Sequence, residues 1–127
     1  MKTHSSDLER RAAQARTGWT PAETLRLIRL YDRMLELEAA GLLGRSKAQG
    51  QTSKAELVRL YIEEGLEWAE DPRSKAVPRS KGSVESKLMN LSAVRVELGL
   101  PIVSGYKALP NMSSSTRELG TEAWGVK

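Results

Sequence analysis

The sequence predicts an all-α protein, a small helical bundle with main helices at about 20–40, 53–69 and 83–98. Apolar residues recur at helical spacing in all three segments, and helix-capping or helix-stopping residues bound each segment. The composition is 39% hydrophobic and 28% charged, without Phe or Cys. In a chain of 127 residues this composition is typical of one domain with an aliphatic core.

The first helix has the clearest start signal. Thr20 can cap free backbone amides, Pro21 suits the first helical position, and Glu23 completes a capping box. Two apolar stripes follow to about residue 40, and their combined width indicates burial against more than one neighbour. This helix is therefore expected to be central, and the short helix expected before it lies in an N-terminal arm of residues 1–17.

The second and third helices are each amphipathic. Ser53 and Glu56 repeat the capping-box pattern ahead of a helix with an acidic outer face. The third helix is expected to start near Ser83 and to end before Gly99. We assign residues 18–99 to the helical domain and residues 100–127, rich in Gly, Pro and Ser, to an irregular, extended C-terminal tail.

Positive charge is concentrated immediately before and within the third helix. Residues 71–95 contain six Lys or Arg and two Asp or Glu, an excess equal to the net charge of +4 of the whole chain. Cations ahead of a helix start are typical of small domains that bind nucleic-acid phosphates. The expected phosphate contacts are Arg73, Lys75, Arg79, Ser80, Lys81 and Lys87.

One face of the third helix is small and polar, and it could enter a major groove. An Asn side chain can pair bidentately with adenine, and Ser can touch other base edges. The candidate base-reading residues are Ser83, Ser86 and Asn90. The competing interpretation is that Asn90 forms hydrogen bonds within its own domain.

The segment RSKGSVESKLMN at 79–90 resembles the R-S-x-x-S-V-x-x-K-L-x-N signature of small helical domains at the N-termini of bacterial and phage HNH endonucleases and related phage proteins. Trp19 and the following Leu-rich helix match the opening of those domains. The resemblance implies a Myb/SANT-like, helix-turn-helix-like layout in which the third helix contacts DNA. It also implies a phage or mobile-element origin.

The sequence departs from that family in two respects. Trp19, Trp68 and Trp124 are much more widely spaced than the tryptophans of a Myb repeat, so only the three-helix layout is carried over. The nuclease module of the relatives needs paired histidines, and this sequence contains only His4.

Independent catalysis is not expected. Without Cys there is no thiolate nucleophile or thiolate metal site, and the serines at 113–115 have no histidine to activate them. A cluster of carboxylates in the second helix has the pattern of a solvated helix face rather than of a metal pair. These residues are Glu63, Glu64 and Glu67. No cofactor is expected.

The sequence therefore predicts a non-catalytic, cytoplasmic DNA-binding protein whose partner is duplex DNA. No signal peptide or membrane span is indicated. The alternative is a protein-binding module, such as a phage-encoded inhibitor of a host defence system or a small subunit of a nucleoprotein complex. It would bind its partner through the acidic face of helix 53–69 or through the C-terminal tail.

Overall fold

The computed structural model describes residues 19–70 and 79–125. This part of the chain contains four α-helices and one short 3-10 helix, and no strand longer than an isolated bridge. The elements are α2 (Pro21–Ala39), η1 (Lys47–Gln49), α3 (Lys54–Glu70), α4 (Lys81–Glu97) and α5 (Ser114–Trp124). The all-α class and the three predicted main helices are confirmed. The expected N-terminal helix, Arg73 and Lys75 lie outside the described residues.

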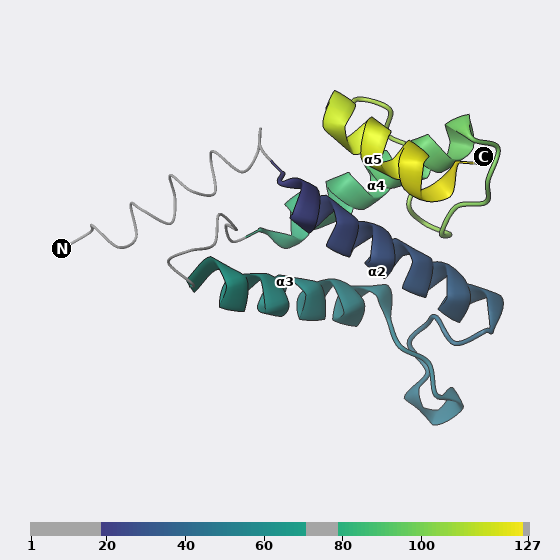
Figure 1. Cartoon of the computed structure of the whole chain (residues 1–127). Helices are drawn as coiled ribbons and strands as arrows, with labels where there is room; N and C mark the ends of the chain where they lie inside the picture. The colour runs from purple at the N-terminus through teal and green to yellow at the C-terminus, as the bar shows by residue number, and fades with distance from the viewer. Residues whose placement is uncertain (1–18, 71–78, 126–127) are drawn as a thin grey trace.

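The helices pack around a central pair formed by α2 and α4. α3 contacts both of these helices from one side, and α5 contacts both from the other side. Figure 1 shows α3 and α5 on opposite sides of α2. The fully buried core comes mainly from the central pair, and aliphatic side chains dominate it as predicted. Its largest members are Tyr31, Leu27, Met34, Leu88 and Leu91.

α2 begins as its sequence predicts. The Thr20 hydroxyl accepts a hydrogen bond from the Glu23 backbone N–H, and the Glu23 carboxylate accepts one from the Thr20 backbone N–H at 3.0 Å. Pro21 occupies the first turn, where its missing N–H costs no hydrogen bond. The capping box therefore fixes both the first residue of α2 and the position of the Glu23 side chain.

α4 starts two residues earlier than the sequence indicated. Ser80 is the N-cap, and its hydroxyl accepts a hydrogen bond from the Ser83 N–H at 3.1 Å. Gly82 therefore lies within the first turn instead of before the helix. Ser80 and Ser83 are both serines that could cap a helix, and the local sequence does not distinguish between them.

The prediction of an extended C-terminal tail was wrong for residues 114–124, which form α5. Ser113 caps this helix by accepting a hydrogen bond from the Thr116 N–H. Gly120 lies in its interior and is buried, and a Cβ atom there would lie 3.0 Å from a Val94 methyl group of α4. Gly120 and the serines at 113–115 have low helix propensity, so the sequence did not predict this helix. In the structure Ser113 caps the helix and Gly120 allows it to pack closely against α4.

Trp124 anchors the end of α5 to the central pair. Its indole N–H donates to Asp32 Oδ1 at 2.8 Å, and its ring lies 5.4 Å from the Tyr31 ring. The guanidinium of Arg95 lies 4.8 Å from the Trp124 ring centre. α5 is thus part of the folded domain.

The Tyr31 hydroxyl joins the segment before α5 to the same core. It forms a 2.6 Å hydrogen bond with the Ser92 hydroxyl of α4 and accepts another from the Val103 N–H at 2.9 Å. Val103 is fully buried. Segment 100–113 therefore also belongs to the folded domain, although it contains no helix.

Candidate nucleic-acid interface

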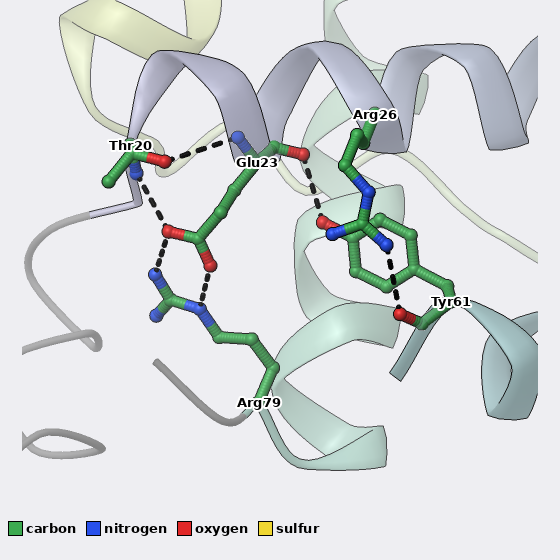
Figure 2. A network of polar contacts seen from close by, with 5 residues as sticks. All are labelled: Thr20, Glu23, Arg26, Tyr61 and Arg79. Atoms are coloured by element: carbon green, nitrogen blue, oxygen red, sulfur yellow. Dashed lines mark hydrogen bonds and ion pairs between the residues drawn. The ribbon is translucent and has the colours of Figure 1, made fainter. Parts of the chain in front are cut away.

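Arg79 precedes Ser80, the N-cap of α4, and its side chain is buried. Its Nε and Nη2 atoms donate to the two carboxylate oxygens of Glu23, each at 2.7 Å. Both side chains are nearly inaccessible, with 4% and 6% of their surface exposed. Figure 2 shows the guanidinium facing the carboxylate that also closes the capping box of α2. The pair therefore ties the start of α4 to the start of α2.

Trp19 covers this ion pair. The Arg79 guanidinium lies 4.3 Å from the Trp19 ring centre, and the Lys87 ammonium lies 5.5 Å from it. The Tyr61 ring is stacked on Trp19, and its hydroxyl donates to the Glu23 carbonyl at 2.9 Å. In the sequence, Trp19 is notable only as part of the family motif. Its position immediately before the N-cap of α2 is one at which an apolar side chain commonly packs against the helix start, and it could have predicted this packing role.

Arg79 was predicted to contact phosphate, and its geometry argues against that role. Its guanidinium is held bidentately by a buried carboxylate and is stacked on an indole ring. Releasing it toward a ligand would leave the Glu23 charge buried without its partner, at a cost of about 3–5 kcal/mol. We therefore assign Arg79 to the fold.

The first two turns of α4 remain accessible. Ser80, Lys81 and Ser86 are exposed, and Ser83 is half-buried. The first turn contains no acidic residue. The positive end of the helix dipole, the first-turn amides other than that of Ser83 and the exposed Lys81 therefore lie together at the surface. The predicted phosphate contacts Ser80 and Lys81 thus lie on the same accessible surface as the predicted base-reading residues Ser83 and Ser86.

Lys87 lies at the edge of this surface. Its side chain is half-buried, as expected from its place beside the buried seam of α4. Burial, and secondarily the Arg79 charge, lower the pKa of the Lys87 ammonium below its ordinary value. Its charge is thus disfavoured by its surroundings and would be stabilised by a bound anion.

Asn90 is buried and forms hydrogen bonds within its own domain. Its Nδ2 donates to the Leu109 carbonyl at 2.7 Å and to the Asn111 carbonyl at 3.3 Å. The neighbouring Met89 carbonyl accepts a hydrogen bond from the Leu109 N–H. Segment 100–113 therefore covers the helix face that carries Asn90, and the predicted base-reading role of Asn90 is not compatible with this geometry.

The second half of α4 is also too buried to read a DNA groove. Six consecutive residues, from Asn90 to Arg95, are buried. A helix inserted into a major groove needs one open face along the part that touches bases. The prediction that helix 83–98 presents such a face is therefore wrong beyond its first two turns. Ser83 and Ser86 lie on the part that stays open.

The outer face of α3 has mixed charge. Arg59 forms ion pairs with Glu63 at 2.6 Å and with Glu56 at 3.8 Å, while Arg26 of α2 reaches Glu64 at 3.2 Å. Leu60, between these acids, is 43% exposed. Much of the predicted acidic character is thus compensated by neighbouring arginines.

Metal-binding clusters and membrane spans are absent from the described ranges. These ranges contain no group of three or more His, Asp or Glu side chains that could hold a metal ion. No helix within them is both long enough and apolar enough to cross a membrane. Comparison of the chain with protein-family models, with curated proteins and with solved structures gave no match.

Proposed function

We propose that the protein is a non-catalytic DNA-binding protein that contacts the phosphate backbone through Lys81 and the first two turns of α4, together with Arg73 and Lys75 of the preceding basic segment. The observation that carries this proposal is the exposed start of α4, which combines Lys81, free helix amides and the absence of acids in the first turn. The predicted resemblance of residues 79–90 to HNH-associated domains supports the same proposal and a phage or mobile-element origin. The proposed location is cytoplasmic.

The expected recognition is of phosphates more than of bases. The accessible or half-buried polar side chains at the start of α4 are Ser80, Lys81, Ser83, Glu85 and Ser86, with Lys87 at the edge. Hydroxyl and ammonium groups of this kind hold phosphate oxygens and position a protein on a duplex, but carry little sequence information. Binding should therefore depend steeply on salt and weakly on sequence.

A salt titration tests this proposal. Binding to a fluorescent duplex is measured by anisotropy over a series of KCl concentrations, and the logarithm of the association constant is plotted against that of the salt concentration. Each lost phosphate contact reduces the slope by about one. We expect Lys81→Ala to flatten the slope by this amount. Lys107→Ala removes an exposed cation of the 100–113 segment and is the matched control. An unchanged slope in Lys81→Ala would reject the site.

A second candidate function is protein binding through the outer face of α3. The exposed Leu60 among charged side chains favours it, because protein interfaces commonly combine an apolar contact with a charged rim. Leu60→Asp should abolish capture of a host partner from nuclease-treated lysate, while leaving duplex binding unchanged. Loss of the captured partner on nuclease treatment of the unmodified protein would instead indicate an indirect, DNA-mediated association.

A further inference from the structure

A groove with a volume of about 580 Å³ lies beside the loop that connects α2 to α3. Its walls come from the end of α2, from residues 43–56 and from Ser104. α3 runs from this loop toward the end of the molecule at which α4 begins (Figure 1). The groove is therefore a separate place on the molecule, and its volume is within the range of about 300–1,000 Å³ typical of small-molecule sites.

The loop wall is held by its own hydrogen bonds. Gln51 links two parts of the loop, since its Oε1 accepts from the Ser46 N–H at 3.0 Å and its Nε2 donates to the Gly41 carbonyl at 3.1 Å. Backbone hydrogen bonds join Leu42 and Gly44 to Thr52. The loop is thus closed before any ligand arrives, which reduces the ordering cost of binding.

The opposite wall is fixed by Ser104. Its backbone N–H donates to the Glu38 carboxylate at 3.1 Å, and its carbonyl accepts from the Lys54 ammonium. Lys54 also lies 4.8 Å from the Tyr106 ring centre. Because an ammonium has three N–H donors, Lys54 retains donors for another acceptor in the groove.

The charge of the lining is unbalanced. Its carboxylates, Glu38 and Glu56, are occupied by the Ser104 N–H and by the Arg59 guanidinium. Arg45 and Lys47 line the groove, are exposed, and form no ion pair in the part of the chain that the structure describes. The lining therefore contains three cations and two carboxylates, a net charge of +1, and of the two carboxylates only Glu56 has a cationic partner, Arg59 at 3.8 Å.

We propose that this groove binds a small phosphorylated molecule through Arg45, Lys47 and Lys54. A guanidinium can grip two phosphate oxygens at once, and lysine ammonium groups act as point charges beside it. The lining contains no aromatic side chain on which a base could stack, so the phosphate group is the part that the groove recognises. This site goes beyond the proposed DNA contacts and uses different residues.

Calorimetric titration with pyrophosphate at constant ionic strength, in the absence of DNA, tests the proposal. We expect saturable binding that Arg45→Ala/Lys47→Ala weakens at least tenfold. Arg29→Ala/Arg33→Ala, which removes two exposed cations of α2 outside the groove, should change the affinity less than twofold. Both variants replace exposed side chains, and thermal unfolding checks that each remains folded.

Three results would overturn the proposal. The first is equal weakening of pyrophosphate binding in the two variants, and the second is the lack of saturable binding. The third is tighter binding of citrate than of pyrophosphate, because carboxylates would then be the preferred ligand. We expect Arg45→Ala/Lys47→Ala to bind duplex DNA with an unchanged salt slope. The pyrophosphate titration therefore tests the groove, and the salt titration tests the DNA contacts, independently of each other.

Discussion

The two halves of α4 contain similar polar residues and use them differently. In the first half, Ser80, Lys81 and Ser86 are exposed, and the first turn contains no acidic residue. In the second half, Asn90, Ser92 and Arg95 are buried and form hydrogen bonds with other parts of the domain. In the second half, segment 100–113 contacts Asn90 through the Leu109 carbonyl, and α5 packs against Val94 at Gly120. Polar residues on one helix face can therefore serve a ligand at one end and the fold at the other.

Arg79 lies two residues before α4 and serves the fold, although its neighbour Lys81 is exposed, and its removal should have the largest effect. Arg79→Ala leaves the Glu23 carboxylate buried without its partner, so we expect a loss of about 3–5 kcal/mol in the free energy of unfolding. Urea denaturation measures this. Lys81→Ala, two residues away and exposed, should stay within about 0.5 kcal/mol of the unmodified protein.

The double variant Glu23→Gln/Arg79→Met sharpens this prediction. It removes both charges and should be less destabilised than Arg79→Ala alone, since neither charge is left unpaired. A loss in Arg79→Ala no larger than that in Lys81→Ala would show that the pair does not hold α4 in place.

Asn90→Ala tests the buried half of α4. The substitution leaves the Leu109 carbonyl without its side-chain donor, and we expect a loss of about 1–3 kcal/mol in the free energy of unfolding. Duplex affinity and its salt dependence should not change, as long as the measurement is made where the variant is folded. A specific loss of duplex affinity without loss of stability would restore Asn90 as a DNA contact.

Alkaline pH should weaken the packing around α4. Burial raises the pKa of Tyr106 to about 12, and it also raises the pKa of Tyr61. The folded state thus favours the protonated tyrosines. This stability is fully present below the ordinary tyrosine pKa of about 10 and is lost as pH rises through the folded value. Thermal unfolding midpoints should fall above pH 10, and Tyr106→Phe should reduce that fall.

Lys87→Met should have the smallest effect on stability and a clear effect on binding. The surroundings of Lys87 lower its pKa, so at neutral pH an apolar side chain of similar length should keep stability within about 0.5 kcal/mol. The salt slope of duplex binding should nevertheless fall by about one. A large loss of stability would show instead that the ammonium holds the structure together.

Local signals predicted much of this molecule. The capping box of Thr20 and Glu23 and the helical spacing of three segments were readable from the sequence, and the structure contains all of them. The sequence did not show which segments pack over each helix face. Asn90 looks the same whether it faces solvent or the Leu109 carbonyl, and α5 has too few apolar residues to show a period.

The ion pair between distant parts of the chain could not be predicted from the sequence either. Glu23 and Arg79 are 56 residues apart in the chain, and nothing in the local sequence of Arg79 distinguishes it from its basic neighbours. The resemblance to HNH-associated domains predicted from residues 79–90 points to the same segment, but even as a prediction it does not separate the residues that hold the fold from those left free to bind.

Amide chemical shifts can map the duplex-binding surface residue by residue, and they report directly on whether the start of α4 contacts DNA. We expect titration of a short duplex to perturb the backbone amides of residues 80–87, with the largest changes in the first turn of α4. The amides of the α3 outer face, residues 56–64, should remain unchanged. Perturbations confined to α3, or absent from residues 80–87 while the duplex is bound, would contradict the proposed DNA contact.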